Sequence, residues 1–161
     1  MNTHQSSTEH ISKILNDEFK LMHDLKQLLE LEQAILIENE ADKLATTLQE
    51  KNKLIAEINQ LEKQRTHHLN QLGHSNDAEG MQTFLAQQNA TNLPQTWQEL
   101  MGVSSQAQEL NRNNGMLISR QLNRNQQALN ILQKNDPHSS TYGADGQTKL
   151  GTNTARGFSV G

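Results

Sequence analysis

The sequence predicts an all-α fold: an elongated antiparallel helical hairpin or coiled coil, a further long helix, and a disordered C-terminal tail. Apolar residues recur every three or four positions through the first part of the chain, which is the period of an amphipathic helix. Only 33% of the 161 residues are hydrophobic and 3% are aromatic, well below what a deep globular core requires. The last part of the chain is polar and has no period, which is typical of a flexible segment.

Two long helices make up the predicted hairpin. Ser6 and Glu9 have the spacing of a capping box, so the first helix is expected over about residues 7–37. Asn39, in the polar break that follows, is the expected N-cap of the second helix, and Gly73 should end it. A short loop between two long helices favours an antiparallel pair.

A short helix and then a longer one are expected after the hairpin. Asn76 and Glu79 form the expected cap pair of the short helix, and Pro94 is tolerated in the first turn of a long helix over about residues 94–134. The apolar stripe of the long helix becomes polar at residues 104–115, so a helix that is bent, frayed or completed by another chain is expected there. The predicted domains are a hairpin at 1–72, a variable linker with a short helix at 73–93, a long helix at 94–135 and a flexible tail at 136–161.

The distribution of charge separates the two ends of the chain. The formal net charge is −4, so the chain lacks the basic footprint of a nucleic-acid-binding domain. Residues 1–65 hold 12 acidic and 8 basic side chains, whereas residues 111–135 hold no acid and four bases. There is no cysteine, no apolar run long enough to insert stably in a membrane, and no signal-peptide pattern in the first ten residues, so a cytoplasmic protein is expected.

The sequence shows no pattern that carries catalysis or cofactor binding. It has neither a phosphate-binding loop nor a dinucleotide-binding glycine pattern. His67 and His68 are adjacent and point in different directions on a helix, so they are expected to be solvated rather than to chelate a metal. Glu30 and Glu32 are expected on a solvated charged face. No enzyme activity, cofactor or metal is therefore expected.

The candidate functional site is a second amphipathic stretch at residues 110–132. Basic residues accompany its apolar edge, which consists of Leu110, Leu117, Ile118, Leu122, Leu129 and Leu132. One interpretation is simply a third helix of a bundle. The other is a helix that docks with a helix of a partner, since such recognition uses anchors at helical spacing.

These residues resemble the FlgN family, the flagellar export chaperones for the hook–filament junction proteins. The resemblance covers about residues 8–72 and 105–148, and residues 73–94 do not match. In the hairpin it consists of residues common in any coiled coil: Leu28, Leu31, Glu32, Ala34, Leu36, Asp42, Leu44, Lys51, Leu54, Leu61, Glu62 and Arg65. More specific is a series in the rear half: Asn111-x-x-Asn114-Gly115, Leu117-Ile118, Leu122, Ala128-Leu129, Leu132 and Tyr142-Gly143-Ala144-Asp145-Gly146.

The resemblance implies a cytoplasmic type III export chaperone that binds the C-terminal region of FlgK and FlgL and delivers them to the export apparatus. It places client binding on residues 110–132. The client-binding residues predicted there are Leu110, Asn114, Gly115, Leu117, Ile118, Leu122, Leu129 and Leu132. An alternative from a different class is a structural coiled coil, an oligomerisation or adaptor protein with no export client. The pattern is compatible with a homo-oligomer in both cases.

Overall fold

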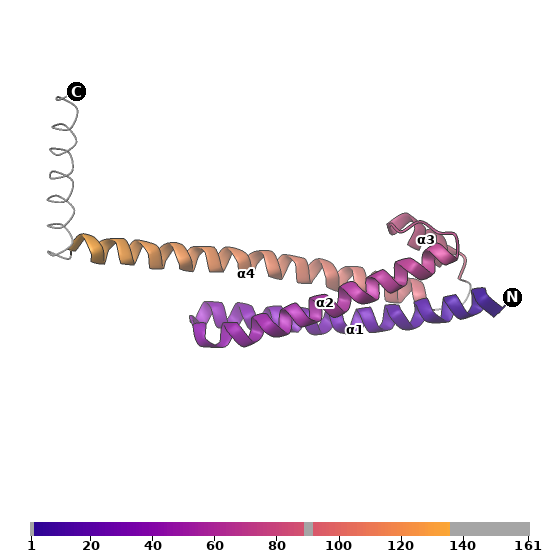
Figure 1. The fold of residues 1–161 in the computed structure, drawn as a ribbon, viewed down its shortest axis with the longest axis horizontal. Helices are drawn as coiled ribbons and strands as arrows, with labels where there is room; N and C mark the ends of the chain where they lie inside the picture. Colours follow the sequence, from indigo (N-terminus) through magenta and orange to yellow (C-terminus); the bar gives the residue numbers. More distant parts are fainter. Residues whose placement is uncertain (1, 89–91, 136–161) are drawn as a thin grey trace, which may run out of the picture. The chain divides into compact units, whose positions relative to one another are not determined.

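The computed structural model describes residues 2–88 and 92–135, and these residues form helices and short turns with no strand (Figure 1). The helices are α1 (Asn2–Glu38), α2 (Ala41–Gln71), α3 (Ala78–Ala86) and α4 (Leu93–Asn135). The chain divides into two compact units, Met1–Leu117 and Ile118–Gly161, so α4 belongs partly to each. The all-α prediction is confirmed, and the predicted tail at 136–161 lies outside the described residues.

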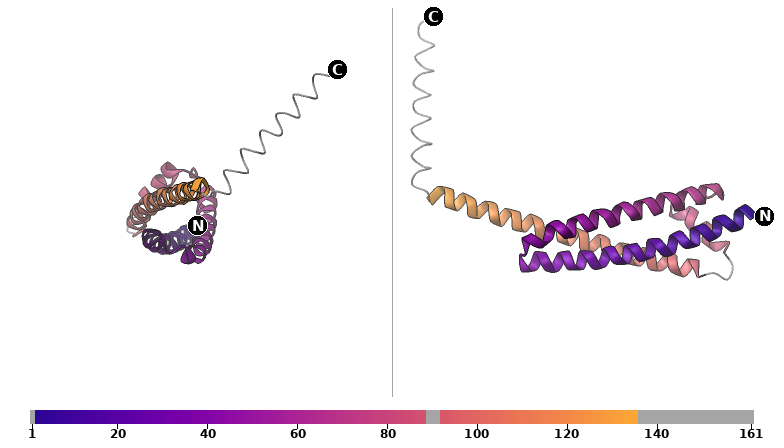
Figure 2. Two further views of the ribbon diagram at one scale, coloured as in Figure 1. Left: turned by 90° about the vertical axis from the view of Figure 1, so that its left-hand side faces the viewer. Right: turned by 60° about the horizontal axis from the view of Figure 1, so that its bottom comes forward.

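α1 and α2 form the predicted antiparallel hairpin (Figure 2). The start of α1 differs from the prediction, because the helix begins at Asn2 and Ser6 lies inside it. Ser6 therefore caps nothing, and its carbonyl oxygen lies against Nδ1 of His10 one turn later.

Asn39 ends α1 instead of starting α2, which corrects the predicted cap. It has a φ of 60°, a left-handed conformation that asparagine tolerates better than most residues. The backbone N–H of Asn39 donates to the carbonyl of Leu36, and that of Glu40 donates to the carbonyl of Ile35. This is the Schellman arrangement, which satisfies the last carbonyls of a helix. Glu40 occupies the N-cap of α2 without a side-chain cap.

The segment between α2 and α3 turns through a second motif of the same kind. Gly73 has a φ of 80° and follows the end of α2, as predicted. Asp77, not the predicted Asn76, caps α3, since its carboxylate accepts from the N–H of Gly80 at 2.9 Å. A Cβ at Gly80 would lie 2.0 Å from the carbonyl oxygen of Ser75, so only glycine fits this close approach.

Two apolar clusters hold the unit Met1–Leu117 together. The larger joins all four helices and consists of Ile11, Leu15, Leu69, Met81, Phe84, Leu85, Leu93 and Leu100. The smaller consists of Leu25, Leu29 and Ala107, so α4 continues along the hairpin beyond the first cluster. The expected fraying at residues 104–115 is not found, because α4 is helical throughout this region.

A buried ion pair lies between the two clusters. Arg65 Nε donates to Glu18 Oε2 at 2.9 Å, and both side chains are almost fully buried. The guanidinium also lies over the ring of Trp97, 5.0 Å from its centroid, so the pair links α1 and α2 to the start of α4. Burial raises the pKa of Glu18 above its ordinary 4.5, because loss of hydration outweighs the attraction of Arg65.

Candidate docking surface on α4

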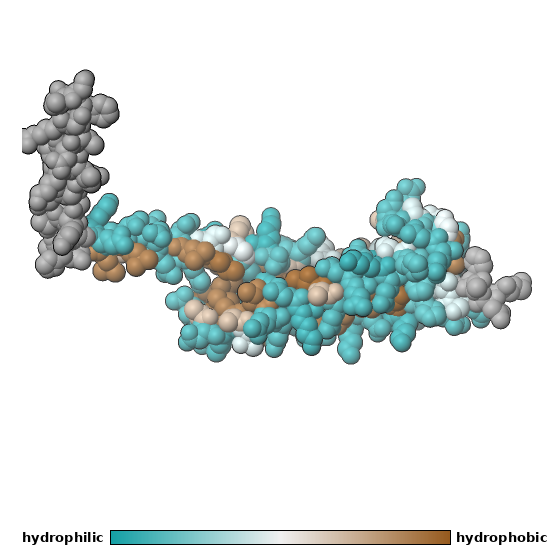
Figure 3. All heavy atoms as spheres, in the orientation of Figure 1, coloured by the Kyte–Doolittle hydropathy of each residue, from teal (hydrophilic) through white to brown (hydrophobic). Residues whose placement is uncertain are grey.

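The part of α4 that follows Leu117 exposes a row of large apolar side chains. Ile118, Leu122, Leu129 and Leu132 are 36, 63, 51 and 67% exposed. Their intervals of four, seven and three residues place them on one face of the helix. The apolar surface runs along this part of α4 in Figure 3. Single apolar side chains scattered over a protein surface are common and indicate nothing. Four of them on one helix face form a contiguous apolar patch, which is typical of a docking surface.

Basic side chains occupy other faces of the same segment. Arg120, Arg124 and Lys134 are exposed, and none of them forms an ion pair within residues 2–88 and 92–135. The segment 118–135 has no acidic residue, so its formal charge is +3 from these three bases. Ile131 is 59% exposed, and its position in the helix repeat places it away from the row of Ile118 and Leu122.

The other four predicted site residues lie nearer the hairpin. Leu110 is half-buried and packs against the smaller cluster, and Leu117 is also half-buried. Gly115 is exposed, and a Cβ added there would meet nothing within 4 Å. Asn114 is 1% exposed and faces α1, where its Nδ2 donates to the carbonyl of Leu29 at 2.9 Å. The structure thus places the predicted site residues in an inner, partly buried group and an outer, exposed group.

Asn114 belongs to a polar network that the sequence analysis missed. Its Nδ2 also donates to Glu32 Oε2 at 2.8 Å, and Lys51 Nζ lies 2.7 Å from Glu32 Oε1. Glu32 is only 3% exposed, which corrects the expectation of a solvated charged face for this residue, while Glu30 is exposed as expected. One signal was available: Glu32 lies on the same stripe as Leu29 and Leu36, where an unpaired carboxylate would be costly.

This network fixes the position of α4 where the first unit ends. Amide and carboxylate hydrogen bonds are directional, so they select one register of α4 against α1 where apolar packing alone would allow several. Oδ1 of Asn114 has no hydrogen-bond partner among the described residues, so the network is not fully satisfied. Burying this oxygen without a partner lowers the stability of the folded chain, so the specific register of α4 against α1 comes with a loss of stability.

The described residues offer no site of another kind. Among residues 2–88 and 92–135, no group of three or more histidine, cysteine or acidic side chains is arranged to hold a metal ion. No helix in the same part of the chain is long and apolar enough to span a membrane. His67 contacts Gln71, and the ring of His68 stacks on that of His10 at 5.2 Å.

Comparison with known proteins identifies the family. The FlgN protein family model matches residues 1–150. The chain is 30% identical to the flagella synthesis protein FlgN of Salmonella typhimurium over 154 residues, which cover 93% of this chain and 98% of the relative. It is 30% identical to the protein of the same name from Escherichia coli K12 over 142 residues, covering 86% and 89% of the two chains.

The family model also covers residues 73–94, which carried no resemblance in the sequence alone. A third genus has a similar protein. The Proteus mirabilis protein of the same name is 29% identical over 144 residues, which cover 88% of this chain and 91% of the relative. No solved structure matches the chain. A family model that spans residues 1–150, together with relatives matched over most of both lengths, shows that the chain belongs to the FlgN family and has a role in flagellar synthesis.

Proposed function

We propose that this protein is a cytoplasmic export chaperone. It binds the C-terminal region of the hook–filament junction proteins FlgK and FlgL and delivers them to the flagellar type III secretion apparatus. The observation that carries the proposal is the exposed apolar face of α4, formed by Ile118, Leu122, Leu129 and Leu132. Family membership supports the flagellar context, and the face supports the mode of binding.

The spacing of these side chains suits an amphipathic helix of a client. A helix that lays its apolar side against another helix uses anchors one or two turns apart, as these residues are. Burying four anchors at about 1.5–3 kcal/mol each contributes on the order of 10 kcal/mol before costs. Ordering a client segment takes back about 2–5 kcal/mol, so the complex remains releasable, as export requires.

The two groups of predicted site residues have different roles in this mechanism. Ile118, Leu122, Leu129 and Leu132 contact the client directly. Asn114 does not contact the client in this mechanism. It positions α4, because its hydrogen bonds to Leu29 and Glu32 hold the helix on the hairpin in one register. Arg120 and Arg124 lie on other faces of the helix, so their charges should mainly change the association rate and its salt dependence. The mechanism requires no catalytic residue, cofactor or metal ion.

The proposal is tested by titrating variants with a peptide of the C-terminal helical region of FlgK. Ile118→Asp and Leu122→Asp should each weaken binding by about 100-fold or more, because an unpaired carboxylate in an apolar contact costs several kcal/mol. Ile131→Asp is the matched control, since Ile131 is 59% exposed on another face, close to the 63% of Leu122, and it should change affinity by less than about threefold.

Helicity measured by circular dichroism separates two ways in which the test can fail. If the Asp variants stay helical and bind like the wild type, the client docks elsewhere. If they lose much of their helicity, the face was part of the folded protein itself. A chain that binds no FlgK or FlgL peptide at all supports the alternative, an adaptor coiled coil without an export client.

A further inference from the structure

A second apolar surface lies within the first unit, in a groove of about 310 Å³ that α1, α2 and α4 line together. Its apolar lining consists of Met22, Leu25, Leu29, Ile55, Ile58 and Ala107. All the residues that line this groove precede Leu117, so the groove belongs to one unit of the chain.

The groove exists because the middle of α4 carries small and polar side chains. Leu93 and Leu100, seven residues apart, fill the larger cluster, but the next buried position after another seven residues is Ala107. Polar side chains of α4, among them Ser104, line the groove beside it. They leave part of the apolar surface of the hairpin uncovered, so Ile55 is 38% exposed. The polar interruption seen in the sequence at 104–115 thus leaves a gap that apolar side chains of another chain can fill.

This groove is electrically neutral. Among the described residues that line it, the charged one is Lys51, and its Nζ lies 2.7 Å from Glu32 Oε1. An occupant whose contact face is apolar and uncharged therefore leaves no ion without a partner. We call this surface the neutral groove.

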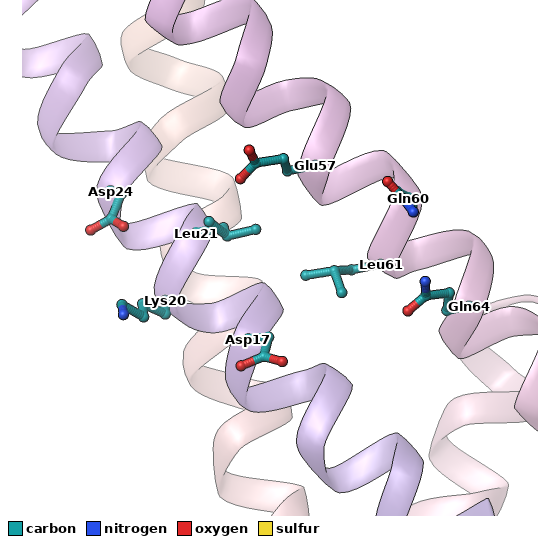
Figure 4. Close-up of a pocket in the computed structure, with 8 residues that line it drawn as sticks. All are labelled: Asp17, Lys20, Leu21, Asp24, Glu57, Gln60, Leu61 and Gln64. Atoms are coloured by element: carbon teal, nitrogen blue, oxygen red, sulfur yellow. The ribbon is translucent and has the colours of Figure 1, made fainter.

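The groove between α1 and α2 differs in this respect (Figure 4). Leu21 and Leu61 point toward one another across it, but charged residues also line it: Asp17, Lys20, Asp24 and Glu57. An apolar helix seated there would remove water from these charges without replacing it. The neutral groove is therefore the better site for an apolar helix face.

The exposed row of Ile118, Leu122, Leu129 and Leu132 has the properties that the neutral groove requires. Its side chains are large and apolar and lie on one face of α4. The three basic residues of the segment 118–135 lie on the opposite side of the helix, so they stay in water when the row is buried. The groove extends over about two turns of each helix, long enough for two side chains one turn apart, such as Ile118 and Leu122.

We propose that the neutral groove of one copy of this chain binds the apolar row of a second copy. Both surfaces are exposed in the single chain, and association removes both from water. Because the groove is short, the association is weak and depends on concentration. The proposed function assigns the same row to the client, so client and second copy compete for it. On this point alone the inference rests on the proposed function.

Disulfide formation between two different variants tests the contact. The chain has no cysteine, so every engineered variant carries a single thiol. I55C is mixed in turn with each variant of the row: I118C, L122C, L129C and L132C. At least one mixture should give about fivefold more mixed disulfide than I55C with I131C, because a disulfide forms only where the two Cβ atoms approach closely. L31C in place of I55C is the second control, since Leu31 is 51% exposed and lies outside the groove. Equal yields in all mixtures overturn the inference.

Analytical ultracentrifugation of the full chain measures the association itself. The wild type should form species larger than the monomer as its concentration rises, and these should persist at about 500 mM salt, because the contact is apolar. I55D and L122D should each raise the dissociation constant at least about tenfold, since each places an unpaired carboxylate in the contact. L31D, and R120E combined with R124E, should leave it unchanged.

Two results of this measurement overturn the inference: a wild type that stays monomeric at every concentration, and an association that I55D does not weaken. If circular dichroism shows that I55D has lost helicity, Q108W decides instead. Gln108 is exposed and lines the groove, so an indole there blocks it without adding a charge and should weaken association in the same direction.

The two proposals fail separately. I55D should bind the FlgK peptide like the wild type, because Ile55 lies outside the row. A chain that binds the peptide and stays monomeric overturns this inference alone. A chain that associates through Ile55 and the row and binds no FlgK or FlgL peptide overturns the proposed function alone. If both hold, the peptide should reduce the yield of the mixed disulfide between I55C and the row.

Discussion

Glu18 and Arg65 are two charged residues that the fold buries between helices. They sit on the apolar stripes of α1 and α2, at 3 and 8% exposure, and their pair is covered by Trp97 of α4. Burial raises the pKa of Glu18 more than the nearby Arg65 lowers it, which is typical of a charged pair that has lost its water. The hydrogen bonds from Arg65 and its position over Trp97 fix how the three helices align here.

Removing one partner of this pair should be more harmful than removing both. Arg65→Met leaves the Glu18 carboxylate buried without a counter-ion and should lower the free energy of unfolding by about 3–5 kcal/mol. The double variant with Glu18→Met should recover most of that loss, because no charge remains buried. Urea unfolding followed by circular dichroism measures both, with Glu18→Met completing the cycle. A cost below about 1 kcal/mol for Arg65→Met would mean that water reaches Glu18.

Each long helix of the hairpin ends in a turn that depends on one left-handed residue. Asn39 follows α1 and Gly73 follows α2, at φ values of 60° and 80°. Glycine adopts this conformation without strain, asparagine does so at a small cost, and a β-branched residue does so at a large one.

Substitutions at Asn39 test whether the turn limits the stability of the hairpin. Asn39→Gly should leave the free energy of unfolding within about 1 kcal/mol of the wild type, and Asn39→Val should lower it by about 1–2 kcal/mol. Thermal unfolding followed by circular dichroism provides the comparison. If both variants unfold at the wild-type temperature, the turn adopts another conformation in solution. Asn52→Val, at an exposed position inside α2, is the control for loss of helix propensity alone.

The two units of the chain, Met1–Leu117 and Ile118–Gly161, differ in what their described residues contribute. Residues 1–117 contain both apolar clusters and the buried ion pairs Glu18–Arg65 and Glu32–Lys51, which hold the hairpin, α3 and the first part of α4 together. Every large apolar residue of 118–135 is exposed, and none of them belongs to either apolar cluster.

A chain that ends at Leu117 should therefore fold and fail to bind client. Its cooperative thermal transition should have the same midpoint as that of the full chain, because both apolar clusters lie within the residues that remain. Its affinity for the FlgK peptide should fall below detection. Calorimetry measures both quantities on one sample. A truncated chain that unfolds without a transition would show that residues 118–161 stabilise the core after all.

The helices, their order and the hairpin followed from the sequence because the period of apolar residues is a local property. The same local signals were ambiguous at helix ends. Asn39 is as suitable for an N-cap as for a left-handed C-terminal residue, and Asp77 and Asn76 are both good caps. Which of two suitable residues takes the role depends on how the chain enters the next helix, and the structure decided it.

The apolar residues of the candidate site were likewise predictable, because their helical spacing in the sequence places them on one face of α4. The sequence by itself determined the amphipathic helices, the end of α2 at Gly73, the place of Pro94 in the first turn of α4, and the stretch at 110–132 that carries both apolar and basic residues. Only the tertiary structure decided that Glu18 and Glu32 are buried and that Asn114 faces inward. Those outcomes depend on Arg65, Lys51 and Leu29, which lie 19–85 residues away in the chain. A charged or amide side chain can be buried only where such a partner replaces its water, and no local pattern carries that information.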